Sequence, residues 1–575
     1  MNYMEEYQHW LDSPALSNAE WEELKSISGD EKEIESRFFA PLEFGTAGLR
    51  GIMGMGLHRM NIHVIRHATQ GFASVICAEG EQAKQKGVAI CYDCRNNSAS
   101  FAHEAAAVMA GNGIRVRIFE AMRPTPELSF AVIHYGCTAG LNITASHNPK
   151  EYNGYKVYWS DGAQLPPQHA EAIARAMSEI DVFNGIKYME FDEGVANGMI
   201  TYMGGECDED FLQCVLGQAI DPEAVKAVAD EFKIVYTPFH GTGYKLVPEA
   251  LRRLGMKHII PVPEQMVIDG NFPTVVSPNP ENPEGFELAV RLAREVGSDL
   301  IIGTDPDADR VGVMVRSHSG EYVCITGNQM GVLLLDYIIE ARKRNGTLPV
   351  RPAAIKTIVT TEMAQEVCKY HGVHMDSTFT GFKFMAEKLA EYKRDGSYQY
   401  LMAYEESYGY MMGDYVRDKD AVTAVMMITE MAAYYFAQGM TLADAMDSLY
   451  EKYGYFAEKT LNLVMPGLDG LEKMKNLMAE LREKPFKEIG GTAVLRVRDY
   501  AAGTVTVPEL GVVGNTEIHG SNVLYFDMSD GCSFIVRPSG TEPKIKIYIL
   551  ARGENRADCD GKVEKYAAFA ETLKR

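Results

Sequence analysis

The sequence predicts an α/β protein with three similar domains of largely parallel sheets and a smaller C-terminal α+β domain, arranged around one central cleft. Two observations support this fold class. Short apolar runs typical of strands alternate with helical segments, and this alternation recurs three times. The chain has 575 residues, whereas single domains usually hold ~100–200. One hydrophobic core is therefore too few for this chain.

The first 40 residues are predicted to be helical. Ser17 and Glu20 have the spacing of a capping box in front of an apolar helix face. A Gly-rich turn at 44–51 follows, and its Arg50 could reach an anion. This turn lacks the strand and helix that flank a dinucleotide-binding GxGxxG sequence, so we reject that interpretation.

Each repeated unit is predicted to contain three strands, and the third strand of each ends in an unusual polar sequence. Because ligands bind beyond the carboxyl ends of parallel strands, these three ends are the expected functional loops. The predicted strands are 87–93, 113–119 and the run ending at Ser146; then 233–237, 258–262 and 299–303; then 355–359, 372–375 and 398–403.

The segment from about residue 460 onward has a different pattern, with several short strands and one terminal helix. This pattern predicts the smaller α+β domain. The predicted strands are 493–497, 504–507, 522–526, 533–536 and 544–550, and the predicted helix is 556–573.

Composition excludes several classes of partner. The net charge of −23, from 56 Lys and Arg against 79 Asp and Glu, argues against nucleic acid or an anionic membrane. Ten cysteines are scattered, and the one close pair, Cys91 and Cys94, lacks a second pair at zinc-site spacing. No run approaches the ~18 apolar residues of a membrane span, and the N-terminus is acidic. We expect a cytoplasmic protein with reduced thiols.

The first functional loop is the sequence that ends the third strand of the first unit. Ser146, His147 and Asn148 place a hydroxyl, an imidazole and an amide together, and Pro149 stops further strand or helix. A Ser beside a His suggests a nucleophile. Taken alone, the tripeptide would favour an ordinary Ser/Asn turn, so the nucleophile interpretation depends on the loops downstream.

The second functional loop carries Asp305, Asp307 and Asp309. Three carboxylates this close repel one another unless a cation binds, and oxygen-only ligands suit Mg²⁺. An EF-hand is excluded because Arg310 and Arg316 stand where that loop needs Gly and Glu. An acidic surface turn is the alternative, but the apolar strands on both sides of the loop argue against it.

Two further loops are suited to a phosphate and a polyol. Arg537 beside the sequence 539–541, Ser-Gly-Thr, fits an anion-binding turn, although a plain β-turn is an equal alternative. Glu405 and Ser407 could pair with sugar hydroxyls. The chain thus combines a candidate serine nucleophile, a divalent-metal site, a phosphate-binding loop and a polyol-binding loop. Together these features predict phosphoryl transfer through serine. The chain has no Walker A pattern, so a nucleoside triphosphate is not the evident donor.

These motifs resemble those of the α-D-phosphohexomutase family, the phosphoglucomutases and phosphomannomutases. The resemblance covers nearly the whole chain, and one motif falls in each predicted domain in the family's order: 144–149, 305–310, 405–409 and 537–541. It implies domains at 1–210 with the phosphoserine loop, 211–320 with the metal loop, 321–458 with the sugar loop and 459–575 with the phosphate loop.

The resemblance also implies a role for each matching residue. Ser146 would be the phosphoserine, and it would hold one Mg²⁺ with Asp305, Asp307 and Asp309. Groups near the transferring phosphate would be Arg50, His147, Lys156 and Lys419. Substrate contacts would be Arg310, Thr380, Gly381, Lys383, Glu405, Ser407, Arg537, Ser539, Gly540 and Thr541.

The implied reaction interconverts glucose 1-phosphate and glucose 6-phosphate through glucose 1,6-bisphosphate, which also acts as activator. Departures from the family are Pro306 and Ala308 in the metal loop and Tyr404 before Glu405. They resemble the branch with bacterial phosphoglucomutases and animal phosphopentomutases. The sequence Glu405-Glu406-Ser407 favours glucose, with mannose, pentose, or a bisphosphate synthase or phosphatase as alternatives. The expected partners are small sugar phosphates, and the expected state is a monomer or small homo-oligomer.

Overall fold

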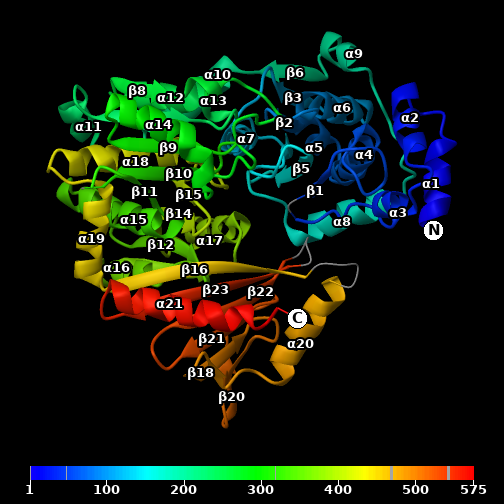
Figure 1. Ribbon diagram of the computed structural model, residues 1–575. Helices are drawn as coiled ribbons and strands as arrows, with labels where there is room; N and C mark the ends of the chain where they lie inside the picture. The colour runs from blue at the N-terminus through cyan, green and yellow to red at the C-terminus, as the bar shows by residue number, and fades with distance from the viewer. Residues whose placement is uncertain (1, 47, 318, 466–469, 540–543, 575) are drawn as a thin grey trace. The chain divides into compact units, whose positions relative to one another are not determined.

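The structure, a computed structural model, describes residues 2–46, 48–317, 319–465, 470–539 and 544–574 (Figure 1). The chain divides into two compact units. Unit 1 contains Met1–Thr326, Ala386–Arg394 and Ser407–Thr441, and unit 2 contains Gly327–Met385, Asp395–Glu406 and Leu442–Arg575. Among the described helices, none is both long and apolar enough to cross a bilayer.

Unit 1 begins with three short helices, as predicted, which are α1 (Tyr3–Leu11), α2 (Asn18–Ser26) and α3 (Glu31–Phe38). The predicted capping box is confirmed, because the Ser17 side chain accepts from the Glu20 N–H and the Glu20 carboxylate accepts from the Ser17 N–H.

The first sheet of unit 1 has the strand order β1-β5-β4-β2-β3-β6. Strands β4, β2, β3 and β6 are parallel, whereas β5 and β1 run antiparallel to their neighbours. Every residue of β2 and β4 is buried, as expected for strands covered on both faces by helices. The strands are β1 (Leu49–Ile52), β2 (Val88–Tyr92), β3 (Val116–Phe119), β4 (Ala139–Ile143), β5 (Tyr152–Trp159) and β6 (Ile200–Met203), and the covering helices include α4 (Ile62–Ala78), α6 (Ser98–Gly111), α7 (Thr125–His134) and α8 (Pro167–Ser178).

The second sheet of unit 1 has the order β11-β10-β9-β7-β8. A helix from the last segment of unit 1, α18 (Ala421–Phe436), packs against α10, α11 and α12. The other elements are β7 (Lys233–Thr237), β8 (His258–Pro261), β9 (Leu300–Thr304), β10 (Val311–Arg316), β11 (Tyr322–Ile325), α10 (Gly205–Leu216), α11 (Pro222–Val228), α12 (Gly243–Leu254), α14 (Glu287–Val296) and β15 (Gly409–Met412).

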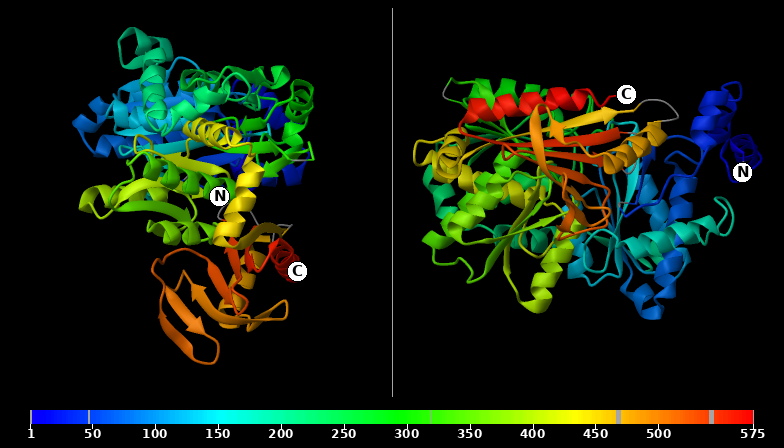
Figure 2. Two further views of the ribbon diagram at one scale, coloured as in Figure 1. Left: turned by 90° about the vertical axis from the view of Figure 1, so that its left-hand side faces the viewer. Right: turned by 90° about the horizontal axis from the view of Figure 1, so that it is seen from below.

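Unit 2 contains a parallel set β13-β12-β14 and an antiparallel sheet, which can be followed in Figure 2 in yellow-green and orange to red. The antiparallel order is β16-β23-β22-β21-β18-β19-β20. The parallel set and its helices are β12 (Pro352–Thr357), β13 (His374–Thr378), β14 (Gln399–Glu405), α15 (Gly327–Arg344), α16 (Met363–His371) and α19 (Leu442–Tyr453). The antiparallel part comprises β16 (Tyr455–Val464), β18 (Thr492–Asp499), β19 (Thr504–Val507), β20 (Gly511–Asn515), β21 (Leu524–Met528), β22 (Ser533–Pro538), β23 (Lys544–Gly553), α20 (Gly470–Glu483) and α21 (Arg556–Glu571).

The three predicted repeats share one topology. In each, the third strand pairs in parallel with the first, and the second lies on the other side of the first: β4-β2-β3, β9-β7-β8 and β14-β12-β13. The α/β fold with an added β-rich domain is thus confirmed. The sheets of unit 1 are mixed rather than purely parallel, because β5 and β10 turn back beside the third strands.

Candidate active site

The serine loop leaves the carboxyl end of β4 and holds Ser146 in a left-handed backbone conformation, with φ of 53°. This conformation is uncommon for a residue with a side chain, so the surroundings must hold it in place. The Ser146 N–H donates to Thr144 Oγ1 at 2.8 Å. Its hydroxyl donates to Asp305 Oδ2 at 3.0 Å and lies 3.2 Å from Nδ1 of His147.

A buried guanidinium holds the rest of this loop. Arg95 donates to the carbonyl oxygens of Ser146, Asn148, Pro149 and Tyr152. One cation thus satisfies four main-chain acceptors, which fixes the path of the loop through the strained serine. The sequence analysis did not single out Arg95, although a cationic residue three positions after a fully buried strand was a usable signal.

The aspartate loop connects β9 to β10, and each of its three carboxylates has a different set of partners. Asp305 Oδ1 accepts the N–H groups of Asp309 and Arg310, at 3.0 and 2.9 Å. Asp307 Oδ2 accepts from Lys156 Nζ at 2.6 Å. Asp309 Oδ2 lies 3.2 Å from both Lys156 Nζ and Lys419 Nζ.

Two oxygens of this loop are left over. Asp307 Oδ1 and Asp309 Oδ1 are buried and have no hydrogen-bond partner. Burying a carboxylate oxygen in this way costs free energy unless a ligand binds to it. One oxygen from each of the three aspartates lies within 4.8 Å of the others. Burial, and next Asp307 and Asp309, raise the pKa of Asp305 well above its ordinary value. The oxygen-only donor set and the unpartnered atoms fit a hard divalent cation such as Mg²⁺.

Two lysines bring positive charge to the same loop. Burial disfavours the ammonium of Lys156, but Asp307 and Asp309 outweigh it and raise the pKa of this lysine. Lys419 also contacts Asp418 at 3.2 Å, and Asp418 accepts from Tyr158 Oη at 2.8 Å. Lys156 is therefore held as a cation beside the serine and aspartate loops, and Lys419 forms an ion pair with Asp309 in the same place.

Arg50 and His147, the other basic residues predicted near the serine, lie in unit 1 as well, and so does the predicted substrate contact Arg310. Arg50, on β1, donates to Asn148 Oδ1 at 3.1 Å. Arg310 forms an ion pair with Glu281 at 2.6 Å. Burial, followed by Arg310 and Arg50, holds the pKa of His147 well below its usual range. His147 is therefore neutral at physiological pH, and its Nδ1 is within reach of the Ser146 hydroxyl.

The departures in the metal loop have local explanations. Ala308 has φ of 50° and is fully buried, which explains why glycine would suit this position. Pro306 lies against Gly241, where an added Cβ would approach Pro306 Cα to 2.4 Å. The Thr242 N–H also donates to the Pro306 carbonyl at 2.8 Å. The proline is therefore accommodated by the glycine of a neighbouring loop.

The predicted sugar-loop residues fall in both units. In unit 2, the Gly381 N–H donates to Glu405 Oε1, and Thr380 is half-buried. Lys383 Nζ lies 4.7 Å from the centre of the Phe384 ring. Ser407 belongs to unit 1 and is half-buried in the turn before β15.

The predicted phosphate loop follows β22 in unit 2. Arg537 Nη1 donates to Tyr548 Oη at 3.4 Å, and the Ser539 N–H donates to the Lys544 carbonyl at 2.8 Å. Gly540 and Thr541 lie outside the described residues. Arg537 is half-buried at the end of its strand.

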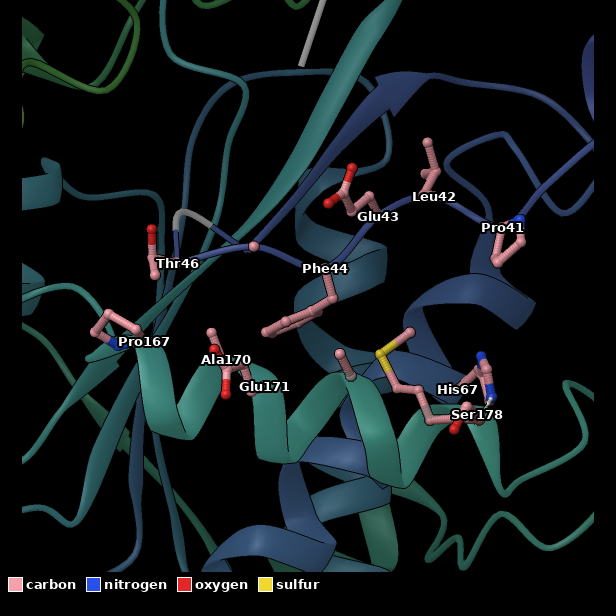
Figure 3. Close-up of a pocket in the computed structure, with 13 residues that line it drawn as sticks. Pro41, Leu42, Glu43, Phe44, Thr46, His67, Pro167, Ala170, Glu171 and Ser178 are labelled. Carbon is pink, nitrogen blue, oxygen red and sulfur yellow. Dashed lines mark hydrogen bonds between the residues drawn. The ribbon is translucent and has the colours of Figure 1, made fainter. Parts of the chain in front are cut away.

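A separate cavity of about 490 Å³ lies in unit 1, between helix α8 and the segment that leads into β1 (Figure 3). Phe44 lines the cavity from the segment before β1, and Ala170 and Glu171 line it from α8. His67 lies at one end, and Met177 also contributes to the lining. Neither the serine loop nor the aspartate loop contributes to its lining. This cavity is therefore distinct from the cluster around Ser146.

Comparison with known proteins gives matches along most of the chain. Sequence models described as phosphoglucomutase/phosphomannomutase α/β/α domains I, II and III match residues 41–183, 209–320 and 326–453. A phosphoglucomutase of Staphylococcus saprophyticus is 36% identical over 528 residues, which is 91% of this chain and 93% of that protein. One from Staphylococcus aureus is 35% identical over 547 residues, covering 94% and 95%.

Solved structures share the fold at lower identity. A putative phosphomannomutase from Thermus thermophilus aligns with a TM-score of 0.67 at 20% identity, covering 93% of this chain and 99% of that one. Parafusin, a phosphoglucomutase from Paramecium, aligns with a TM-score of 0.64 at 16% identity, covering 92% and 94%. The domain matches and the identity to the staphylococcal enzymes show that this chain belongs to the phosphoglucomutase/phosphomannomutase family.

Proposed function

We propose that this protein is a phosphoglucomutase, which interconverts α-D-glucose 1-phosphate and glucose 6-phosphate through phosphorylated Ser146 and a glucose 1,6-bisphosphate intermediate. One observation carries the proposal. The Ser146 hydroxyl is hydrogen-bonded to Asp305, in a buried cluster whose other two carboxylates each have one oxygen without a hydrogen-bond partner and have two lysine partners. The names of the staphylococcal relatives support the choice of glucose.

The roles of the residues in unit 1 follow from their contacts. Asp305, Asp307, Asp309 and phosphorylated Ser146 would hold Mg²⁺, which offsets negative charge on the transferring phosphoryl group when bound. Lys156 and Lys419 add fixed positive charge beside it. The Ser146 hydroxyl proton is directed to Asp305 Oδ2 in this structure. Neutral His147, with Nδ1 3.2 Å away, can accept that proton instead if the hydroxyl turns toward it when the free serine is phosphorylated again.

The substrate would be gripped by the remaining loops. Glu405 is oriented by the Gly381 N–H, which suits a carboxylate that must meet sugar hydroxyls in a fixed direction. Arg537 would supply a charge-assisted contact to the phosphate that is not reacting. The other proposed substrate contacts are Arg310, Thr380, Gly381, Lys383, Ser407, Ser539, Gly540 and Thr541.

The domain boundaries and the cellular compartment complete the proposal. We retain four domains, 1–210, 211–320, 321–458 and 459–575, each contributing one loop to catalysis or binding. All ten cysteines are free thiols, which supports a reducing compartment, and we therefore propose a cytoplasmic enzyme acting on small sugar phosphates.

The test is a coupled assay of glucose 1-phosphate conversion with Mg²⁺, with and without glucose 1,6-bisphosphate. We expect turnover that the bisphosphate stimulates and that Ser146→Ala lacks. Mannose, ribose and deoxyribose phosphates, assayed in parallel, should react more slowly than glucose phosphate. Faster reaction of another sugar would reassign the substrate. Release of inorganic phosphate, or net accumulation of bisphosphate, would replace the mutase with a phosphatase or synthase.

A further inference from the structure

The aspartate loop is held by a residue from a different part of unit 1, which the sequence motifs do not include. Thr125 is the first residue of α7, and 182 positions separate it from Asp307. Its main-chain N–H donates to the Asp307 carbonyl oxygen at 2.8 Å. Its hydroxyl donates to Asp307 Oδ2 at 2.7 Å. Thr125 thus grips both the backbone and the side chain of one aspartate.

A third residue determines where the Thr125 hydroxyl points. Asn142, on β4, donates from Nδ2 to Thr125 Oγ1 at 2.7 Å. A hydroxyl has a single proton, and a donor on its lone pair leaves that proton to be given elsewhere. The acceptor in line is Asp307 Oδ2. Asn142, Thr125 and Asp307 are all fully buried, so water does not compete for these bonds.

Asp307 Oδ2 accepts a second hydrogen bond, from a residue on the neighbouring strand. Lys156 on β5 lies directly opposite Asn142 in the antiparallel pairing, where side chains share one face of the sheet. Lys156 Nζ is 2.6 Å from Asp307 Oδ2. Oδ2 is therefore fixed by an ammonium and a hydroxyl, while Oδ1 is buried without a partner. A carboxylate held in this way cannot exchange its two oxygens by rotation without losing both donors.

We propose that Thr125 is a positioning residue for the metal site: it fixes Asp307 so that Oδ1 faces the cation, and Asn142 fixes Thr125 in turn. This inference rests on the proposed function, because it takes Asp305, Asp307 and Asp309 as the metal ligands. The competing explanation is that Thr125 only joins α7 to the aspartate loop. That role would affect the stability of the metal-free chain and leave its metal affinity unchanged.

The experiment compares three variants of the full chain after chelator treatment. Thr125→Val keeps the shape and the main-chain N–H but removes the hydroxyl, and Thr125→Ser keeps the hydroxyl. Thr138→Val is the matched control, because the Thr138 hydroxyl is also buried but donates to the Ala83 carbonyl. Titration calorimetry gives the Kd for Mg²⁺, and thermal unfolding without metal gives the Tm.

We expect Thr125→Val to raise the Kd for Mg²⁺ by about 10- to 100-fold, the usual effect of losing a group that orients a metal ligand. Thr125→Ser should stay near wild type, and Thr138→Val should bind Mg²⁺ normally even if its Tm falls. The Mg²⁺ concentration that gives half-maximal mutase activity should rise with the Kd, while kcat at saturating Mg²⁺ recovers.

Equal Kd values for wild type and Thr125→Val would overturn the inference while leaving the metal site intact. Absence of Mg²⁺ binding by the wild-type chain would instead overturn the metal site of the proposed function. If Thr125→Val does not fold, Asn142→Leu takes its place, because it removes the donor that directs the hydroxyl and leaves Thr125 itself unchanged. An unchanged Kd in folded Asn142→Leu would then count against the inference.

Discussion

At the scale of single residues, Ser146 is the position on which the proposed chemistry depends. Ser146→Ala should lower turnover on the order of a thousandfold or more, because the described surroundings of its loop offer no second hydroxyl bonded to Asp305. Intact mass after incubation with glucose 1,6-bisphosphate should show one phosphoryl adduct in the wild type and none in the variant. Ser178→Ala, in the separate cavity, is the control. An adduct that persists in Ser146→Ala would place the phosphoserine elsewhere.

Asp307→Asn tests the charge of the metal loop without changing its size. We expect a large loss of kcat and a modest change in KM, since the cation held there acts on charge that develops during transfer. Steady-state kinetics across Mg²⁺ concentrations provide the measurement. Asp192→Asn, in the first turn of a surface helix, should behave as wild type. A wild-type kcat that survives saturating chelator would argue against any metal at this loop.

Glu127 gives a pH-dependent prediction away from the metal ligands. Burial, followed by Asp208, raises its pKa well above the ordinary glutamate value. The folded chain therefore binds the Glu127 carboxyl proton more tightly than the unfolded chain does. The free energy of unfolding that this difference contributes is lost as pH rises above about 4.5. Glu127→Gln removes this cost. Its Tm should exceed the wild-type Tm by a margin that grows as pH rises above about 4.5, and a margin that does not change with pH would show that Glu127 does not titrate.

Some of these functional residues could be predicted from the sequence and others could not, for a physical reason. Ser146 and the three aspartates stand in short local motifs, and the structure brings them together. Thr125 is a common residue at the start of a helix, and its contact with Asp307 arises only when two sheets of unit 1 are folded. Single-sequence reasoning detects loops that carry chemistry, whereas the groups that orient those loops are contributed by distant elements.

At the scale of elements, Tyr404 on β14 has a consequence for helix α15. Its ring occupies the space beside Gly331, where an added Cβ would lie 2.0 Å from Tyr404 Cε2. Gly331→Ala should therefore destabilise the fold by about 1–3 kcal/mol, the usual cost of overpacking. The gain in helix propensity, about 1 kcal/mol, offsets only part of this.

The matched control for this prediction is Gly561→Ala in α21, where nothing lies within 4 Å of the added Cβ. That substitution should stabilise by about 0.5–1 kcal/mol. Thermal unfolding of both variants makes the comparison. A Tm for Gly331→Ala at or above wild type would mean that the Tyr404 ring moves aside at little cost.

Among the elements that the sequence did not predict are strands with mixed polarity. In β5 a glycine, an asparagine and a lysine interrupt the apolar pattern, and in β16 four polar residues stand among the apolar ones. Strand propensity depends on packing against neighbours more than on the residues themselves. The central strands β2, β7 and β12, with their apolar runs, were predictable because burial on both faces demands such runs.

At the scale of the whole molecule, an acidic chain of net charge −23 must concentrate its cations where phosphates bind. Arg537→Ala should raise KM and lower kcat/KM by roughly 10- to 150-fold, which corresponds to a charge-assisted contact of about 1.5–3 kcal/mol. Arg496→Ala is the control, because Arg496 is an exposed partner of Asp527 in the same sheet. Near-normal kinetics in a folded Arg537→Ala would show that another group holds the idle phosphate.

The division of the chain also has a consequence for its synthesis on the ribosome. Helix α12 ends at Leu254, and α18, which packs on it, begins only at Ala421. At a synthesis rate of about 5–20 residues per second, the apolar faces of α10, α11 and α12 stay exposed for roughly 10–30 s before α18 is synthesised. During this interval the nascent chain carries an uncovered hydrophobic surface. A polypeptide released at Thr326, the end of the first segment of unit 1, would keep that surface permanently and should need a chaperone to remain dispersed.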